Sequence, residues 1–178
     1  MKATVLTISD RAFRGEYEDL SGPEIVRILT DHFGDKIECR SEIVPDEAES
    51  ISAALDCAGG VEKVTGIGFT AHDAHSLSTS EPSDFIITTG GTGIGPRDIT
   101  PETCRMWCEK ELPGISEMLR AESYKETVTA VLSRGFAGLR DRTLVVNFPG
   151  SVKAVRLCTQ LMLPVLEHAS AMMAGGGH

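Results

Sequence analysis

Short apolar runs alternate along this chain with segments in which apolar residues recur every three or four positions. Four runs rich in Val, Ile and Thr predict buried strands, at residues 3–9, 37–44, 85–89 and 144–148. The helical spacing predicts helices near residues 21–33, 47–58, 100–112, 115–125 and 151–173. The segment LSRGFAGL, residues 132–139, fits neither pattern, and its assignment stays open.

Three of the predicted helices begin with recognisable start signals. Ser21-Gly22-Pro23-Glu24 and Thr100-Pro101-Glu102 each place a proline in the first turn with an acid beside it, and Asp46-Glu47 places acids at the start of the next helix. The last helix contains Pro164, which removes one backbone donor, so we expect a kink or a break there.

Alternation of strands and helices predicts the fold class α/β: a three-layer α/β/α sandwich whose central sheet is mostly parallel and covered on both faces. No linker or internal repeat divides the chain, so we expect one domain over residues 1–174 and a flexible tail over 175–178. Residues 59–84 have the least structured composition.

The composition narrows the function further. The 178 residues are 41% hydrophobic and carry a formal net charge of −9, without the clustered Lys and Arg that a nucleic-acid groove needs. No apolar run reaches the roughly 18 residues of a membrane span. The first predicted strand begins at residue 2 or 3, which leaves no room for a signal peptide, so we expect a cytoplasmic protein.

Two pairs of side chains have spacings that would allow metal binding. Cys104 and Cys108 lie four apart on a predicted helix, and His72 and His75 lie three apart. The five cysteines are an odd number and form no CxxC motif. We favour the ordinary interpretation of each pair. The two cysteines would be small residues that face the core, and the two histidines would belong to a Ser/Thr-rich surface loop.

Polar clusters follow each of the four predicted strands. They are residues 9–11 (SDR), 45–47 (PDE), 90–98 (GGTGIGPRD) and 149–151 (PGS). The carboxyl ends of parallel strands share one edge of a sheet, which is where open α/β sheets bind ligands, so we expect these clusters to converge.

Three of these clusters also have ordinary interpretations. Asp10 suits a turn, Asp46 and Glu47 suit a helix N-terminus, and Ser151 is a natural helix cap. The loop at 90–98 differs, because four glycines in six positions weaken any strand or helix and usually indicate positive φ or close backbone approach.

The detailed pattern of this loop excludes two common phosphate-binding motifs. A proline stands where GxGxxG needs its third glycine, and no lysine follows as in a P-loop. Backbone N–H groups, the Thr92 hydroxyl and Arg97 are suited to phosphate oxygens. Asp98 then makes sense as a Mg²⁺ ligand, with Asp46 as the second carboxylate, which indicates nucleotide or phosphoryl chemistry.

Longer stretches carry a resemblance to a known family. VLTISDRAFRGEYEDLSG, EIVPDE, FIITTGGTGIGPRDITPE, AVLSRGFAGLRDRTLVVNFPGS and LPVLEHA follow one another as in the MogA/gephyrin G-domain family, over essentially the whole chain. The resemblance implies a MogA/MoaB-like sandwich that assembles as a homotrimer. It also implies a Mg²⁺-dependent nucleotidyltransferase that transfers AMP from ATP to the phosphate of molybdopterin and releases pyrophosphate, a step of molybdenum cofactor biosynthesis.

The resemblance also implies roles for individual residues. Asp46 and Asp98 match the family's essential aspartates, which we expect to organise the metal rather than accept a proton. Nucleotide and phosphate binding falls on Ser9, Asp10, Gly90, Gly91, Thr92, Gly93 and Arg97. Molybdopterin binding falls on Ser133, Gly150 and Ser151.

The chain departs from the family at about residues 59–83, a stretch longer than we expect there. We interpret it as a peripheral insertion on the edge opposite the pocket. No module for molybdate insertion is present, so a separate downstream protein or domain should accept the product.

Two other functions stay open: a non-catalytic pterin-binding or scaffold member, and a pyrophosphohydrolase-like relative. The pair Asp46 and Asp98 favours catalysis over the first. The LSR and PGS segments, which match pterin-handling members, weigh against the second.

Overall fold

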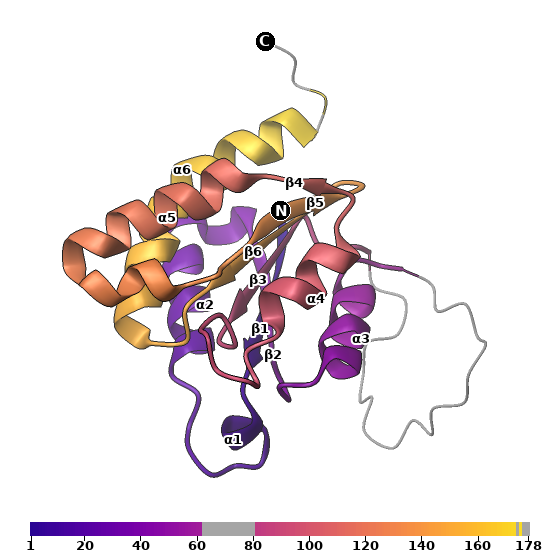
Figure 1. Cartoon of the computed structure of the whole chain (residues 1–178). Helices are drawn as coiled ribbons and strands as arrows, with labels where there is room; N and C mark the ends of the chain where they lie inside the picture. Colours follow the sequence, from indigo (N-terminus) through magenta and orange to yellow (C-terminus); the bar gives the residue numbers. More distant parts are fainter. Residues whose placement is uncertain (62–80, 174, 176–178) are drawn as a thin grey trace, which may run out of the picture.

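The computed structural model describes residues 1–61, 81–173 and 175, and in these segments six strands form one sheet in the order β2-β1-β3-β6-β5-β4 (Figure 1). The strands are β1 (Lys2–Ile8), β2 (Glu38–Val44), β3 (Phe85–Thr89), β4 (Lys110–Glu111), β5 (Ala137–Arg140) and β6 (Thr143–Phe148). The first four in sheet order are parallel, and β5 and β4 are antiparallel additions. The prediction of a mostly parallel sheet is confirmed.

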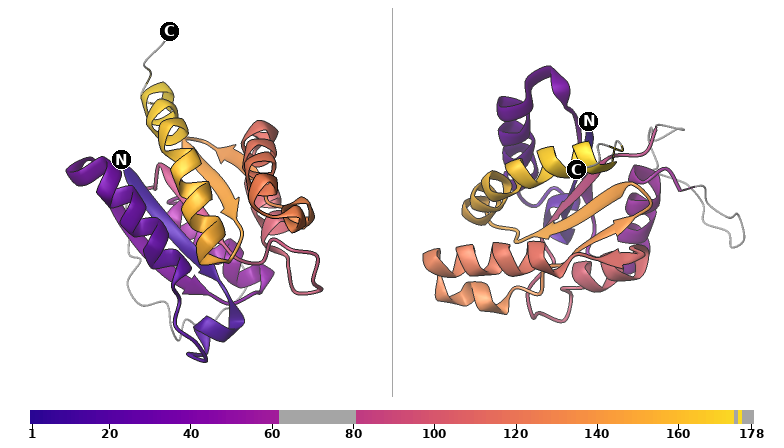
Figure 2. Two further views of the ribbon diagram at one scale, coloured as in Figure 1. Left: turned by 90° about the vertical axis from the view of Figure 1, so that its left-hand side faces the viewer. Right: turned by 90° about the horizontal axis from the view of Figure 1, so that it is seen from above.

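Helices cover both faces of this sheet (Figure 2). The α-helices are α1 (Asp10–Phe13), α2 (Ser21–Phe33), α3 (Ala48–Ala58), α4 (Thr100–Trp107), α5 (Pro113–Glu126) and α6 (Val152–Met173), and the 3₁₀ turns are η1 (Gly34–Lys36) and η2 (Val128–Leu132). Buried residues of α2, α5 and α6 pack in one cluster against the sheet, and those of α3 and α4 pack in a second. The structure therefore has the three layers expected.

Alternating side chains of β3 enter these two clusters. Phe85 and Ile87 lie in the cluster under α2 and α6, whereas Ile86 lies in the cluster under α3 and α4. All five residues of β3 are buried, because it is a central strand covered on both faces. This explains why its sequence is a continuous apolar run rather than an alternation of polar and apolar residues.

The segment between Trp107 and Pro113 is not helical, which corrects the prediction of a helix to residue 112. α4 ends at Trp107, and Lys110–Glu111 pair with β5. Gly138 of β5 allows this approach, because a Cβ there would lie 2.8 Å from the carbonyl oxygen of Lys110. Pro113 begins α5, and the end of the ambiguous LSRGFAGL segment forms most of β5.

The last helix is continuous. α6 runs through Pro164 as one helix, so the break considered above does not occur. Of the expected tail, only Gly175 is described, and residues 174 and 176–178 lie outside the described part of the chain.

Buried cysteines belong to the core, as favoured above. Cys104 is a buried residue of α4 and accepts a hydrogen bond from Asn147 Nδ2 at 3.2 Å. Cys108 is partly buried and packs against the same cluster. Burial raises the pKa of each of these two thiols to about 12. No group of three His, Cys, Asp or Glu suited to a metal occurs in the described segments, and His72 and His75 lie outside them.

The described residues on either side of the expected insertion lie where the amino ends of the parallel strands meet. Ser83 N donates to the Ala58 carbonyl, and Asp84 N donates to the carbonyl of Lys2, the first residue of β1. Residues 62–80 are outside the described part of the chain. Within the described residues, no helix combines the length and apolar character that crossing a membrane requires.

One carboxylate joins α2 to α6 and generates a pH prediction. Glu24 accepts from Arg27 on its own helix and from Arg156 on α6 at 2.5 Å, and these hydrogen bonds lower its pKa to about 2. A lowered pKa stabilises the folded state above the unfolded value, and this stabilisation is lost as the pH falls toward 2. Glu24→Gln should therefore unfold at a lower temperature than wild type at pH 7, with a difference that disappears on acidification.

Thermal unfolding followed by circular dichroism between pH 2 and pH 7 measures this effect. The control is Glu49→Gln, since Glu49 lies in the first turn of α3 with no described arginine or lysine partner. Equal and pH-independent changes in both variants would contradict the role of the two arginines.

Candidate active site

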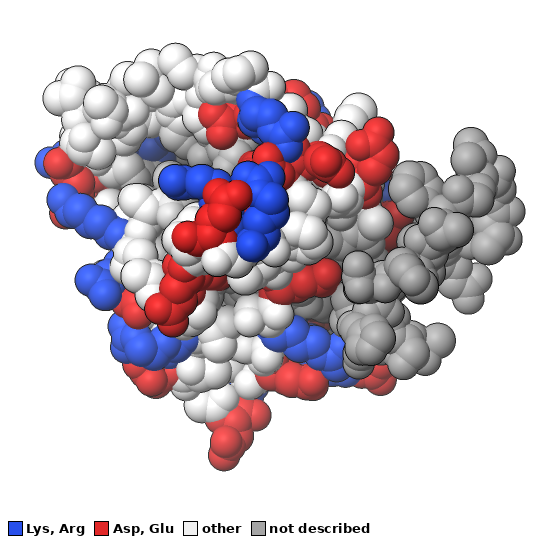
Figure 3. Space-filling view, turned by 90° about the horizontal axis from the view of Figure 1, so that it is seen from below, with Lys and Arg blue, Asp and Glu red and all other residues white. Residues whose placement is uncertain are grey.

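The carboxyl ends of β1, β3 and β6 meet at one point of the sheet edge. Gly90, directly after β3, has φ +101, and a Cβ there would lie 2.3 Å from the carbonyl oxygen of Ile8 in β1. Gly150, after β6, lies against Gly90 from the other side, since its own Cβ would be 3.3 Å from Gly90 Cα. Figure 3 shows the molecule from this side, with acidic and basic side chains interspersed.

Asp10 and Asp46 link the ends of β1 and β2 by reciprocal hydrogen bonds. Asp10 N donates to Asp46 Oδ2 at 2.8 Å, and Asp46 N donates to Asp10 Oδ1 at 3.0 Å. The second carboxylate oxygen of Asp10 accepts from Arg97 of the glycine loop. Three of the four predicted clusters are thus joined directly, and the cap residue of α3 is Glu47 rather than Asp46.

The environment of Asp46 disfavours its charged form. Burial raises its pKa, and the neighbouring carboxylates of Asp10 and Asp98 add to this, while the Asp10 N–H and the charge of Arg97 act in the opposite direction. A Cβ on Gly91 would lie 3.4 Å from Asp46 Oδ1 and one on Gly93 would lie 2.9 Å from Asp98 Oδ2, so both carboxylates border the glycine loop although they come from different strand ends. A cation between them would relieve this repulsion.

Asp98 closes the glycine loop on itself. Its Oδ2 accepts from Gly95 N at 2.7 Å, and a Cβ on Gly93 or Gly95 would approach the same carboxylate to 2.9 or 2.7 Å. A Cβ on Gly91, where φ is +62, would lie 2.2 Å from Thr100 Oγ1. Gly91, Gly93 and Gly95 thus make close contacts within the loop and with Thr100, whereas the close contact of Gly90 is with β1.

A row of backbone donors in this loop has no acceptor. Among the described residues, none accepts a hydrogen bond from the N–H of Thr92, Gly93 or Ile94. Consecutive unpaired N–H groups in a turn form an anion-binding concavity. The predicted phosphate cradle is therefore compatible with the observed backbone.

The donor set beside this row fits Mg²⁺. Thr100 Oγ1 is buried and has no hydrogen-bond partner among the described residues, and it lies at Gly91 beside Asp46 Oδ1. Mg²⁺ is typically bound by one or two carboxylates together with substrate phosphates and water rather than by a cage of protein ligands. Asp46 and Asp98 supply that number of carboxylates.

Two predicted binding residues have structural roles in addition. Ser9 Oγ accepts from Ala12 N at the start of α1 and lies 3.3 Å from the Tyr17 hydroxyl. Ser151 Oγ accepts from Ala154 N in the first turn of α6, which is the ordinary cap role considered above.

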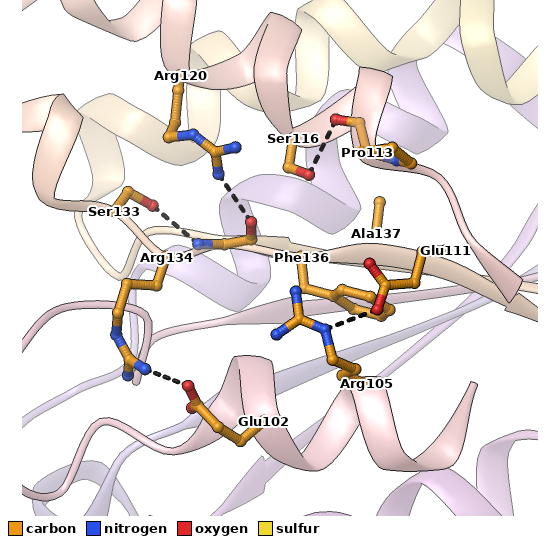
Figure 4. A pocket seen from close by; sticks show the side chains of 11 residues that line it. Glu102, Arg105, Glu111, Pro113, Ser116, Arg120, Ser133, Arg134, Phe136 and Ala137 are labelled. Carbon is orange, nitrogen blue, oxygen red and sulfur yellow. Dashed lines mark hydrogen bonds and ion pairs between the residues drawn. The ribbon is translucent and has the colours of Figure 1, made fainter. Parts of the chain in front are cut away.

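Ser133 borders a cavity of about 350 Å³ between α4, α5 and β5 (Figure 4). Its hydroxyl accepts from Gly135 N, and Arg120 donates to the Gly135 carbonyl at 2.9 Å. Ser133 lies on this side of the glycine loop, whereas Gly150 contacts the loop at Gly90, so the structure gives no direct contact between the predicted molybdopterin residues.

Arg134 was not predicted as a site residue. Its backbone and guanidinium bind carbonyl groups of the glycine loop, and it pairs with Glu102 of α4 (Figure 4). It is the single charged residue between Glu126 and Arg140, and a lone charge in an apolar segment was the signal available.

Comparisons with known proteins agree with this architecture. A sequence model described as a probable molybdopterin binding domain matches residues 4–168. The chain belongs to this molybdopterin-binding family. It is 36% identical over 171 residues to the molybdopterin adenylyltransferase of Helicobacter pylori J99, an alignment that covers 96% of this chain and 86% of that protein.

A solved structure and a longer relative extend the comparison. The molybdopterin biosynthesis enzyme MoaB of Thermus thermophilus superposes with a TM-score of 0.78 at 37% identity and covers 98% of this chain and 96% of that one. The molybdenum cofactor biosynthesis bifunctional protein of Synechococcus elongatus is 35% identical over 176 residues, which is 99% of this chain and 48% of that protein. The resemblance to the MogA/gephyrin G-domain family is thereby confirmed.

Gly90 offers a test of the convergence of strand ends. Gly90→Ala would combine a positive φ with a clash against the Ile8 carbonyl, so we expect a loss of about 3 kcal/mol or more in the free energy of unfolding. Gly15→Ala is the matched control, because Gly15 has φ +70 with no atom within 4 Å of its Cβ position. It should lose only about 1–2 kcal/mol. Urea denaturation measures both, and equal losses would argue against the close contact.

Asp46 should destabilise the ligand-free protein. A raised carboxyl pKa means that stability is lost as the pH rises through the folded-state pKa, so Asp46→Asn should melt above wild type at pH 8. The difference should shrink as the pH falls and Asp46 becomes protonated. The Asn carbonyl can still accept from Asp10 N. Asp35→Asn on the exposed η1 turn is the control for removing one negative charge. A lower melting temperature for Asp46→Asn at pH 8 would contradict the analysis.

Proposed function

We propose that this chain is a molybdopterin adenylyltransferase, which transfers AMP from ATP to the phosphate of molybdopterin and releases pyrophosphate. The observation that carries the proposal is that the carboxylates of Asp46 and Asp98 both border the glycine loop, whose N–H groups at Thr92, Gly93 and Ile94 have no described acceptor. A binding protein has no need for two interacting carboxylates beside a phosphate cradle. The names of the relatives support the same reaction.

The loop would bind the phosphates of ATP. The N–H groups of Thr92, Gly93 and Ile94 are suited to phosphate oxygens, and Arg97, which is 60% exposed, can add positive charge. Asp46 and Asp98 would hold Mg²⁺, which when bound neutralises phosphate charge and polarises the α-phosphorus. The hydroxyl of Thr100, which has no partner among the described residues and lies beside Asp46, is a further polar group next to the proposed metal site.

Molybdopterin would approach from the side of Ser133. The cavity there contains three arginines, Arg105, Arg120 and Arg134, and two glutamates. It is therefore polar and large enough for part of a pterin with polar substituents. Gly150 and Ser151 would contact the same substrate nearer the phosphate cradle.

No proton acceptor is required in this reaction. The attacking phosphate of molybdopterin is already an anion, and pyrophosphate leaves from the α-phosphorus of ATP. Catalysis then rests on alignment of the two phosphates and on neutralisation of their charges. This is why the two aspartates are assigned to metal organisation.

Three further features belong to the proposal. We expect a cytoplasmic homotrimer formed by a single domain over residues 1–174. We also expect the product to pass to a downstream molybdate-insertion protein or domain. The longer bifunctional relative, of which this chain spans about half, supports the last expectation, because it joins a second activity to a chain of this kind.

The reaction is tested by mixing the protein with molybdopterin, ATP and Mg²⁺ and measuring adenylyl-molybdopterin and pyrophosphate. Asp98→Asn should reduce kcat by about 100-fold or more, because it removes the charge that holds the metal. Its amide oxygen can still accept from Gly95 N, so loop and fold should be retained.

The outcomes separate the candidate functions. Product formed by wild type and lost in Asp98→Asn supports the adenylyltransferase. Tight molybdopterin binding without product favours the non-catalytic pterin-binding or scaffold member, and near-normal turnover by Asp98→Asn would exclude the metal role of Asp98. Omission of Mg²⁺ from the assay tests the metal requirement independently.

A further inference from the structure

We propose that Arg134 is a positioning residue that aims the N–H groups of the glycine loop at the phosphates of the nucleotide, an inference that rests on the proposed function. Arg134 contacts the loop in three places. Its N–H donates to the Thr92 carbonyl at 2.9 Å, its Nε donates to the Gly93 carbonyl at 2.6 Å, and its second guanidinium nitrogen donates to the Asp98 carbonyl.

Because of the geometry of the peptide group, these contacts also determine the direction in which the neighbouring N–H groups of the loop point. In a trans peptide the C=O and the following N–H point in opposite directions, and the described chain has no cis peptide. Holding the Thr92 and Gly93 carbonyls therefore turns the N–H groups of Gly93 and Ile94 away from Arg134. Thr100 N, which donates to the Gly91 carbonyl at 3.2 Å, acts in the same way on the N–H of Thr92.

These three N–H groups have no described acceptor, and neither do those of Gly91 and Arg97 in the same loop. The carbonyls of Gly91, Thr92 and Gly93 are thus bound, while the N–H groups of the same three peptides are unpaired. Such donors stabilise an anion most when they are fixed before it binds, because no reorganisation is then required. Arg134 holds two of these peptides, Thr92–Gly93 through its backbone N–H and Gly93–Ile94 through its guanidinium.

Arg134 is itself held firmly. Two residues further on, Phe136 N donates to Asn147 Oδ1 at 3.2 Å and Asn147 N donates to the Phe136 carbonyl at 2.9 Å, so this segment is attached to the central strand β6. Glu102 of α4 pairs with the third guanidinium nitrogen (Figure 4). Arg134 and the hydrogen bonds of its segment therefore connect β6, α4 and the glycine loop.

The geometry requires an arginine. Its planar guanidinium presents donors in a fixed fork and reaches two carbonyls and a carboxylate at once, which the single ammonium of lysine cannot do. Arg134→Lys keeps the charge but should lose at least one of the loop carbonyls. A loss of ligand affinity in this variant would therefore reflect the orientation of the loop and not the overall charge of the site.

The test compares Arg134→Lys and Arg134→Gln with a matched control, Arg140→Lys. Arg140 also donates to a backbone carbonyl, that of Trp107 at 3.2 Å, but it lies at the far end of α4. Calorimetry measures the binding of Mg-ATP and of pyrophosphate, kinetics give KM for each substrate, and urea denaturation gives the stability.

Both Arg134 variants should bind ATP and pyrophosphate about tenfold more weakly or worse, with a matching rise in KM for ATP. Arg140→Lys should leave every binding constant unchanged. Unchanged affinity for both anions in folded Arg134→Lys would overturn the proposal.

The same experiment distinguishes this inference from the proposed function. If wild type binds ATP in an Arg134-dependent way but makes no adenylyl-molybdopterin, the positioning role stands and the adenylyltransferase falls. If wild type binds neither ATP nor pyrophosphate, the loop is no anion cradle and the role of Arg134 falls as well.

Discussion

The contact between Gly90 and the Ile8 carbonyl determines how closely the strand ends of this molecule can converge. With a Cβ position only 2.3 Å from that oxygen, residue 90 has room for a hydrogen atom and nothing larger. Gly150 contacts Gly90 from β6, so three strand ends share one point. The loops after β1, β2 and β3 then lie near enough for Asp10, Asp46 and Arg97 to bond to one another.

The glycine loop shows how a backbone can be given two chemically different sides. Its glycines are accounted for by close internal contacts, at Gly91 with Thr100 and at Gly93 and Gly95 with Asp98. The compactness that they permit brings carbonyls to the side of Arg134 and leaves donors on the other. A P-loop achieves anion binding with a lysine of its own, whereas here the cation that organises the loop comes from a segment more than thirty residues away in sequence.

The sequence predicted the features that depend on a local pattern and missed those that depend on contacts between distant residues. Apolar runs identified β1, β2, β3 and β6, and the shared edge of parallel strands predicted that Asp10, Asp46 and the glycine loop would meet. β4 has two exposed residues and carries no hydrophobic signal, so it was read as helix. The bonds of Arg134 to Gly93 and Asp98 depend on the tertiary placement of β5 and β6, which no local period encodes. Asp98 was expected to be a metal ligand, and the hydrogen bond by which one of its oxygens closes its own loop was not predicted.

The two edges of the sheet have a further consequence for assembly. β2, at one edge, exposes Glu38 and Arg40, which pair with each other, and β4, at the other, consists only of the exposed Lys110 and Glu111. Charged or very short edge strands resist pairing with the strands of another molecule. Copies of this chain that associate are therefore expected to do so through helices and loops, which would keep the sheet of each copy separate.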